Sequence, residues 1–413
     1  MSGILVTGLG TVGAYGCGGE ALRRVLASPD PTSLTSEVDR SAGYHRAGSA
    51  RRAILAREVS LAEWLAPGEA RRMSPPSKLA VAAARMALEC AGFAERRCDR
   101  EEASVVIATA FGPSSYSEAL LQQILFEGPE ATSPFLFTES VANAPAAQIA
   151  ILCRARGSSV TVCQREAGAL QAVGQGAADV ASGRSPRALV GAVDEMTPLL
   201  HSLLDRFGAL IRPGAAGGEV PRPFDRRRAG FMAAEGATVL VLESDESAEE
   251  RGARALARVL AWGSAFDPTA SQAGWGTGHA TLARSLRRGL DRAGVAISEI
   301  DRIVSGASGS RAGDRLEALT LRAAWGALPL PPVLAPKGAL GEYGGGFLGA
   351  AVLAAAGCRF GAASGTTEAD PELGIVPIVP DAGSPLPRPA IVLVTSAAAG
   401  GAFSWLLLGA PAP

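Results

Sequence analysis

Short apolar runs and longer amphipathic blocks alternate along the first part of the chain. A short apolar run between turn residues predicts a buried strand, and apolar residues spaced three and four apart predict a helix. Residues 29–76 are rich in Pro, Ser and Arg and predict an irregular surface segment. The strands expected here are 4–7, 105–108, 188–193 and 237–242, and the helices are 18–28, 77–90, 114–126 and 143–152.

The second part of the chain repeats this alternation after a charged connector. Residues 243–254 are rich in Asp, Glu and Arg, which indicates a solvated link. We therefore predict two halves, residues 1–248 and 249–413. Strands that alternate with helices in both halves predict a layered α/β fold with buried sheets. The strands expected in the second half are 255–261, 302–305, 390–394 and 403–408, and the helices are 279–293, 314–324 and 349–358.

One stretch, Val160 to Gly174, predicts an apolar strand, a tight turn and a helix of small residues. Many α/β enzymes place a nucleophile at such a turn. The side chain there points into a pocket, and the first free amides of the helix favour negative charge. The residue at this turn is Glu166, which is a poor nucleophile. That mismatch is the main indication of function in the chain.

Composition narrows the class of protein. The chain has 413 residues, 47% hydrophobic and 19% charged, so we expect it to bury a large core. A formal net charge of −1 argues against nucleic acid as the main partner. Six cysteines without CxxC or metal-type spacing indicate reduced thiols and no metal site. Gly344–Gly346 lacks the spacing of a phosphate-binding loop, so no cofactor is expected.

The start of the chain lacks the basic region and long apolar run of a signal peptide. No apolar run reaches membrane-spanning length without Gly, Pro or charge. We therefore expect a soluble, cytoplasmic protein that makes no membrane contact.

Several separated motifs share their order with one known family. They are Val6-Thr-Gly-Leu-Gly10, Arg71-Arg-Met-Ser74, Asn143-Ala-Pro-Ala146, and Pro223-Phe-Asp-Arg-Arg-Arg-Ala-Gly-Phe231 with Glu235-Gly236. In order and spacing, they resemble the β-ketoacyl synthase (thiolase-like) family over nearly the whole chain. The resemblance implies a thiolase-like α/β fold, in which two similar halves form five αβαβα layers.

Active members of this family use a Cys at the strand-helix turn and two His residues that assist decarboxylation and condensation. Carried over position by position, the Cys slot falls on Glu166 and the two His slots fall on Gly306 and Glu342. Lys337 of the second His motif is retained, and Ala399 replaces a gating Phe near the C-terminus. The resemblance therefore implies that no catalytic residue is left, since a carboxylate cannot carry an acyl thioester and Gly306 has no imidazole.

This pattern resembles the chain length factor, the ketosynthase-β subunit of type II polyketide synthases, which typically has Gln at the Cys position. The resemblance implies a heterodimer with a catalytic ketosynthase, a role in shaping the chain tunnel, and an acyl carrier protein as second partner. One alternative is a divergent acyltransferase or malonyl decarboxylase that uses Glu166, Glu342 or Cys163. Another is a homodimeric binding protein without catalysis.

Plainer interpretations stand beside these. For Glu166, the plainer interpretation is a partly exposed carboxylate at a helix start, where the helix dipole favours negative charge. If the carboxylate is buried, it needs a raised pKa or a partner, for which Lys337 and Arg165 are the candidates. For Glu342, an ion pair with Lys337 is favoured over a catalytic base. The run Arg226–Arg228 is typical of a solvated face, with docking of an acidic carrier protein as the lesser alternative.

The helix expected at 114–126 carries an apolar stripe that allows two interpretations. Packing in the core is the ordinary one. The resemblance implies the other, because the corresponding helix of the family lies near the dimer interface and the tunnel. Both stay open for the stripe residues Leu120, Leu121, Ile124 and Leu125.

Overall fold

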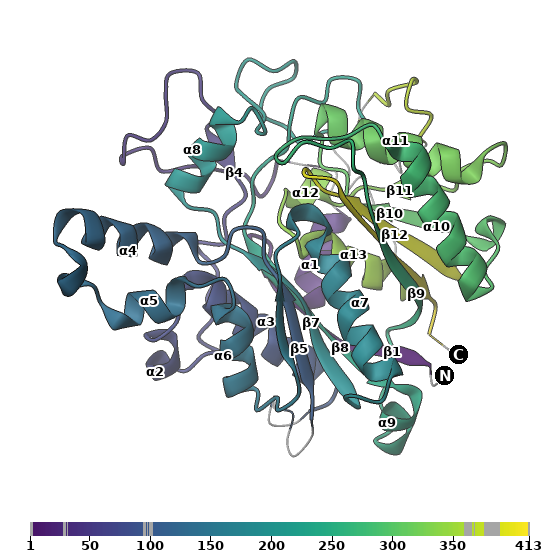
Figure 1. Ribbon diagram of the computed structural model, residues 1–413, viewed down its shortest axis with the longest axis horizontal. Helices are drawn as coiled ribbons and strands as arrows, with labels where there is room; N and C mark the ends of the chain where they lie inside the picture. The colour runs from purple at the N-terminus through teal and green to yellow at the C-terminus, as the bar shows by residue number, and fades with distance from the viewer. Residues whose placement is uncertain are drawn as a thin grey trace.

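The structure is a computed structural model, in which the main strands of each half form a mixed sheet and the two sheets are continuous through one strand pair (Figure 1). It describes residues 3–27, 30, 32–93, 96, 98, 102–358, 366, 368–375 and 389–411. The strands of the first half are β1 (Ile4–Gly13), β5 (Ser104–Ala108), β6 (Ser159–Val162), β7 (Arg187–Asp194) and β8 (Gly236–Ser244). Those of the second half are β9 (Ala257–Phe266), β10 (Arg302–Ser305), β11 (Val333–Leu334), β12 (Ile391–Ala397) and β13 (Ala402–Gly409).

The two halves have the same strand order. The first half runs β6-β5-β7-β8-β1 and the second runs β11-β10-β12-β13-β9, so each is third, second, fourth, fifth, first. In each half the fifth strand, β8 or β13, is antiparallel to both neighbours. The halves join where β1 pairs antiparallel with β9, Ile4 opposite Val259. Because this order repeats, we propose that the chain divides into two halves between residues 248 and 249, as the sequence predicts.

Helices form three further layers, so the predicted five-layer αβαβα fold is confirmed. Two helices lie between the sheets: α7 (Gly168–Ala181) contacts β5, β7, β9 and β13, and α13 (Gly346–Ala355) contacts β1, β8, β10 and β12. The outer layers are α3 (Pro75–Cys90) with α6 (Ala144–Leu152) on the first half, and α10 (His279–Ala293) with α11 (Arg311–Trp325) on the second.

Small residues in α7 let both sheets approach this helix closely. A Cβ added at Gly176 would lie 2.2 Å from Val190 Cγ1 of β7. A Cβ added at Gly174 would lie 2.7 Å from the Trp262 ring of β9, on the other side. The small-residue pattern of the sequence therefore reflects a central helix packed from two sides.

Most of the expected elements are present, with a few differences. The helix expected at 114–126 is α4 (Ser114–Phe126), whereas the first strand extends to Gly13. The charged connector is partly helical, as α9 (Asp245–Glu250), so the predicted boundary falls inside a helix. Residue 28, the end of one expected helix, lies outside the described residues. The sequence did not indicate α5 (Pro134–Ser140) or α8 (Pro198–Arg206).

Short elements complete the described chain. They are β2 (Gly16–Cys17), α1 (Gly18–Leu26), β3 (Ser36–Glu37), β4 (Arg52–Ala53), α2 (Pro67–Ala70), α12 (Lys337–Leu340), and the 3₁₀ turns η1 (Pro129–Ala131), η2 (Arg165–Ala167) and η3 (Ile297–Glu299). Across the described ranges, no single helix has the length and apolar character needed to cross a membrane. Helices α5 and α6 have them only when the two are taken together, and they are sharply bent relative to each other.

The helices α4 and α5 form an arm that projects from the first half (Figure 1). None of the residues of α4 is buried. The stripe predicted there is therefore not packed in the core of this chain. Leu121 and Leu125 are 57% and 75% exposed.

Candidate functional site

A cavity of about 650 Å³ lies where the turn after β6 meets segments from both halves. Its lining brings together three of the predicted positions, Glu166, Glu342 and Ala399. Lys337 and Gly306 lie behind the lining. The spacing in sequence between these positions is large, so the fold alone creates the site.

Glu166 lies in the 3₁₀ turn η2, which leads directly into α7. The preceding residue, Arg165, has a φ of +45°, and the Glu166 carbonyl accepts a 2.7 Å hydrogen bond from Ser396 Oγ. The residue is half-buried, and its Oε2 is buried without a hydrogen-bond donor among the described residues. Burial, followed by the negative charge of Glu342, raises the pKa of Glu166 to about 7, against the opposing effects of Lys337 and Arg165. The effect of burial, which raises the pKa of Glu166, is therefore larger than that of its position at a helix start, which favours negative charge.

Lys337 and Glu342 form the ion pair that the sequence favours. Lys337 Nζ lies 2.7 Å from Glu342 Oε1, and the Lys337 side chain is fully buried. The same ammonium lies 4.8 Å from the centre of the Phe347 ring, at cation–π distance. The second oxygen, Glu342 Oε2, is buried and has no donor in the described part of the chain. The ion pair thus neutralises Glu342 but leaves one oxygen facing the cavity region.

Gly306 is buried at the end of β10, and a side chain has no room there. A Cβ at this position would lie 2.4 Å from Ser396 Oγ. That is the hydroxyl that binds the Glu166 carbonyl. Ser396 therefore occupies the space into which a larger side chain at position 306 would extend, and it ties β12 to the turn of Glu166.

Two acidic residues downstream of Gly306, Asp314 and Glu317, have structural roles. Glu317 accepts hydrogen bonds of 2.6 Å from Ser305 Oγ and from Thr395 Oγ1. Asp314 accepts from the backbone amides of Phe224 and Gly309, and burial raises its pKa to about 7. These carboxyls fix the loop after β10 and the Pro-Phe-Asp segment beside it.

Asp194, which ends β7 and lines the cavity, was not predicted from the sequence. Its Oδ1 accepts from Thr109 Oγ1 and the Ala110 amide, and its Oδ2 accepts from the Gly344 amide at 3.0 Å. Burial raises the pKa of Asp194 to about 6. A carboxylate at the end of an apolar strand was the signal that could have identified it.

The apolar wall of the cavity was not predicted from the sequence either. Helix α8 supplies Leu200, Leu203 and Leu204, and the residue after its end, Phe207, belongs to the same wall. The helix is short and starts with Pro198, behind a Thr197 cap that accepts from the Leu200 amide. This cap and proline were a readable helix start.

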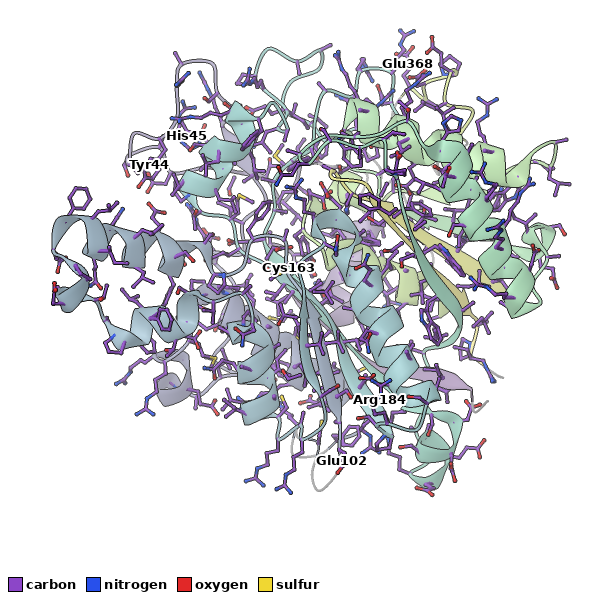
Figure 2. All side chains as sticks on the ribbon, in the orientation of Figure 1. Tyr44, His45, Glu102, Cys163, Arg184 and Glu368 are labelled. Atoms are coloured by element: carbon purple, nitrogen blue, oxygen red, sulfur yellow. The ribbon has the colours of Figure 1, made fainter. Side chains whose placement is uncertain are left out.

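The remaining candidates lie outside the cavity lining. Cys163 is exposed at the end of β6 (Figure 2), and partial burial with the charge of Asp194 raises the pKa of its thiol, which disfavours the nucleophilic thiolate. His201 lies in α8 with its Nδ1 2.9 Å from His45 Nε2, and His279 lies at the start of α10. All three histidines of the chain are described, and none lines the cavity.

The arginine run predicted as a solvated face is exposed at Arg226, partly buried at Arg227 and buried at Arg228, and all three side chains are paired. Arg226 and Arg227 form ion pairs with Glu368 and Asp225. Arg228 is buried and lies 2.6 Å from Asp370, so the solvated-face prediction is wrong for this residue. The pairing reduces the positive charge available for docking an acidic protein.

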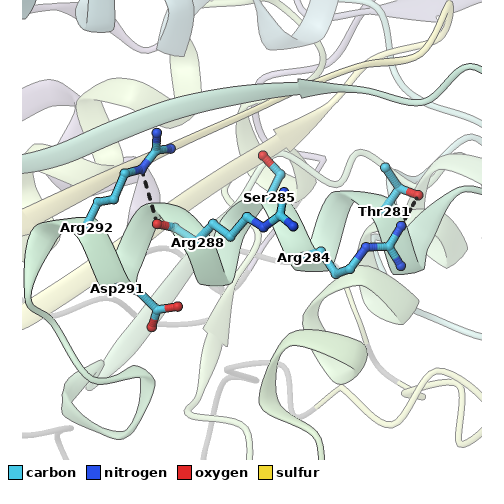
Figure 3. Close-up of a pocket in the computed structure, with 6 residues that line it drawn as sticks. All are labelled: Thr281, Arg284, Ser285, Arg288, Asp291 and Arg292. Carbon is cyan, nitrogen blue, oxygen red and sulfur yellow. Dashed lines mark hydrogen bonds between the residues drawn. The ribbon is translucent and has the colours of Figure 1, made fainter.

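A second hollow, of about 610 Å³, lies along the outer face of α10 (Figure 3). Its side chains all come from this one helix, and three of them are arginines four residues apart. The lining is Thr281, Arg284, Ser285, Arg288, Asp291 and Arg292. Among the described residues, no group of three or more His, Cys, Asp or Glu side chains could hold a metal ion.

Comparisons with known proteins agree with this geometry. Residues 1–248 match the family model "Beta-ketoacyl synthase, N-terminal domain". A relative from Streptomyces halstedii, "Putative polyketide beta-ketoacyl synthase 2", is 29% identical over 84% of this chain and 82% of its own length. The 3-oxoacyl-[acyl-carrier-protein] synthase 2 of Rhizobium meliloti (strain 1021) is 29% identical, covering 73% of each chain.

Solved structures extend the match to the whole chain. "The ishigamide ketosynthase/chain length factor" is 30% identical, with a TM-score of 0.87 over 99% of both chains. A type II polyketide synthase acyl-carrier protein in complex with its ketosynthase includes a chain with a TM-score of 0.85 at 21% identity, covering 99% of both chains, and shares the fold. The chain described here belongs to the β-ketoacyl synthase family.

Proposed function

We propose that this chain is a non-catalytic chain length factor of a type II polyketide synthase. It pairs with a catalytic ketosynthase, forms part of the tunnel that holds the growing chain, and works with an acyl carrier protein that carries this chain. The name of the ishigamide ketosynthase/chain length factor and that of the Streptomyces halstedii relative support this class. We also propose a cytoplasmic location, where a carrier-bound chain would be extended.

One observation carries the proposal: the cavity presents carboxylates where condensation needs a thiol and imidazoles. Decarboxylation of a malonyl thioester develops negative charge on an enolate oxygen, which needs positive or donor groups nearby. Glu166 and Glu342 line the cavity instead, and no histidine does. Buried carboxylates would repel this charge, so the condensation chemistry belongs in the partner subunit.

The α4–α5 arm supports the proposed pairing. Large apolar side chains stay in solvent along both helices, which is typical of a surface that another chain covers. The exposed apolar residues of the arm and its ends are Leu121, Ile124, Leu125, Phe126, Phe135, Phe137 and Val141.

Two buried carboxyl groups hold this arm in place. Glu195 accepts from the Ser115 amide at 2.8 Å, at the start of α4. Glu139 of α5 accepts from the Ser74 amide at 2.8 Å and from Gln148 Nε2 at 2.7 Å. An arm anchored in this way presents its apolar side chains in a fixed direction, which lowers the entropic cost of binding a partner.

The edge of the sheet gives a second surface for pairing. Strand β6 ends the strand order of the first half and is hydrogen bonded to β5. Ser159 and Val160 of β6 are exposed. An open edge strand can add a strand from another chain, so β6 and the arm together support an extended interface.

Co-expression with a catalytic type II polyketide ketosynthase subunit from the same organism tests the proposal. We expect the two chains to co-purify as a heterodimer, and the pair, with carrier protein, to make a product of defined length. Replacing Leu121 or Ile124 with smaller or larger residues should change this length if the arm helix borders the tunnel. A stable homodimer that fails to bind the ketosynthase would favour the homodimeric binding protein instead.

A malonyl decarboxylase or acyltransferase remains the alternative because of one observation. A carboxyl with a pKa of about 7, as for Glu166, suits acid-base chemistry at neutral pH. Purified chain without partner is incubated with acyl or malonyl carrier protein. Release of carbon dioxide, or an acylated subunit by intact mass, that is lost in Glu166→Gln would support the enzyme and contradict the non-catalytic proposal.

A further inference from the structure

The cavity holds two buried acceptor atoms that the protein itself does not satisfy. Glu342 has a side chain only 9% exposed, and its Oε2 has no donor among the described residues. Glu166 Oε2 is in the same situation, and both residues line the cavity. A buried acceptor without a donor costs free energy, so both atoms are poised for a ligand that brings donors.

The other charged side chains of the lining already make hydrogen bonds within the chain. Asp194 accepts three hydrogen bonds, from Thr109, Ala110 and Gly344. Arg165 Nη1 donates to the Ala399 carbonyl, and Arg311 Nε donates to a backbone carbonyl of the 223–231 segment. The acceptors of Glu166 and Glu342 thus stand out as the groups that a ligand would meet.

The rest of the lining is largely apolar. Leu203, Leu204 and Phe207 come from α8 and the residue that follows it, and Phe231 and Trp275 come from the facing loops. A cavity of about 650 Å³ with an apolar wall and a few polar groups is typical of a site for a small molecule. Its ligand would have an apolar body and a polar head.

The charge at the polar end decides the kind of head. Lys337 neutralises one carboxylate, Glu342, through the other oxygen of that group. Glu166 has no such partner: Glu342, Lys337 and Arg165 act on it only through their charges, and Glu342 opposes its ionisation. A cationic donor relieves this repulsion, whereas an anionic head adds to it.

We propose that this cavity binds a small primary amine with an apolar body, whose ammonium group donates to Glu166 and Glu342. The site then has the opposite charge preference from one built for a malonyl group. The proposal goes beyond the chain length factor function and does not depend on a partner subunit.

Calorimetric titration of the full-length chain with n-octylamine, octanoate and octan-1-ol tests it. We expect octylamine to bind about tenfold more tightly than either other probe. Its affinity should rise from pH 6 to pH 8, since Glu166 loses its proton over this range while the amine stays charged. The other charged groups in or behind this lining are Glu342, Lys337, Arg165, Asp194 and Arg311.

Three variants locate the binding. Glu166→Gln and Glu342→Gln should each weaken octylamine binding by about fivefold or more, because each replaces an acceptor oxygen with a donor amide. Glu249→Gln on the exposed end of α9 is the matched control and should bind as the wild type does. Thermal unfolding of each variant shows that it is folded.

Equal or tighter binding of octanoate would overturn the proposal, as would unchanged octylamine binding in both glutamine variants. Absence of saturable octylamine binding up to about 5 mM would overturn it too. Failure of the chain to pair with a ketosynthase would leave these titrations unaffected, so the two proposals fail separately.

Discussion

The α4–α5 arm and the cavity depart in opposite directions from the usual distribution of apolar and charged side chains. The arm exposes Leu125 and Phe126 at 75% and 84%. The cavity region buries Lys337 completely and Glu342 almost completely. Exposed apolar groups and buried charges both cost free energy. Each region therefore meets a requirement other than the stability of this chain.

Helix α10 gives the ordinary pattern against which both regions stand out. Its Leu282, Leu286 and Leu290 are buried, and Arg284 and Arg288 lie along the hollow on its outer face (Figure 3). The same kind of apolar stripe in α4 contacts no core. The difference supports the proposal that another chain covers the arm, whereas Lys337 within this chain neutralises part of the charge of the cavity.

The largest expected effect is the loss of the buried ion pair. Lys337→Met keeps the volume of the side chain but leaves Glu342 without its cation. We expect the free energy of unfolding to fall by about 4 kcal/mol, measured by urea denaturation. The double variant Lys337→Met/Glu342→Leu should recover most of this loss. A single variant that loses less than about 1 kcal/mol would contradict the role of Lys337 in this cavity.

The next comparison sets a core leucine against an arm leucine. Leu286→Ala in α10 removes a fully buried side chain and should lower the free energy of unfolding by about 3 kcal/mol. Leu125→Ala in α4 removes an exposed side chain and should change it by less than about 0.5 kcal/mol. Thermal or urea unfolding of the chain without partner measures both. Equal losses would mean that α4 packs more tightly than the structure shows.

Binding of the partner should depend on the arm and not on the outer face of α10. Leu125→Asp places a charge in the proposed interface and should weaken ketosynthase affinity by about 100-fold, measured by titration of the purified subunits. Arg288→Asp, on the outer face of α10, is the matched control and should leave the affinity unchanged. An effect of similar size from both variants would argue against the arm as the interface.

The smallest expected effect is the pH dependence contributed by Glu166. Its pKa is about 7 in the folded chain against an ordinary 4.5, so the folded state binds the proton more tightly. Stability from this group is therefore full below pH 4.5 and is lost as the pH rises to 7.

Glu166→Gln removes this loss. At pH 8 the variant should be more stable than the wild type by about 2 kcal/mol, less than the full shift implies because the residue is half-buried. At pH 4.5 the two proteins should have similar melting temperatures. Asp194 and Asp314 titrate in the same direction, so only the difference between variant and wild type isolates Glu166. An equal difference at both pH values would contradict the raised pKa.

Much of the fold was predictable because long periodic segments carry strong local signals. The bounds expected for α4, α10 and β10 agree with the structure. Helices α5 and α8 were missed because both are short and begin with proline, so their apolar periodicity spans too few residues to be recognised. The charged composition of 245–250 suggested a link rather than α9, although the Ser244 cap accepting from the Ser247 amide marks a helix start.

The candidate site was predictable only in part. Family register assigned Glu166, Gly306 and Glu342, and the cavity lining contains the first and the third. Gly306 lies behind Ser396, a residue that no motif singled out. Asp194 was missed because its partner, the Gly344 amide, lies 150 residues away in sequence.

The sequence by itself determined which residue stands at each position of the strand-helix turn and of the motifs that follow it. These identities exclude a cysteine nucleophile at the turn and an imidazole at 306 and 342. Local periodicity also determined that the chain is a layered α/β protein, because the alternation of apolar and polar residues sets which face of each element can be buried.

Only the tertiary structure decided the burial and the electrostatic surroundings of Glu166 and of the leucines of α4. Ser396 Oγ meets the Glu166 carbonyl across 230 residues of sequence, and burial beside Glu342 then raises the pKa of Glu166 to about 7. The apolar stripe of α4 is typical of a core helix, yet none of the residues of α4 is buried. Burial and charge depend on contacts between distant segments, which no local pattern encodes.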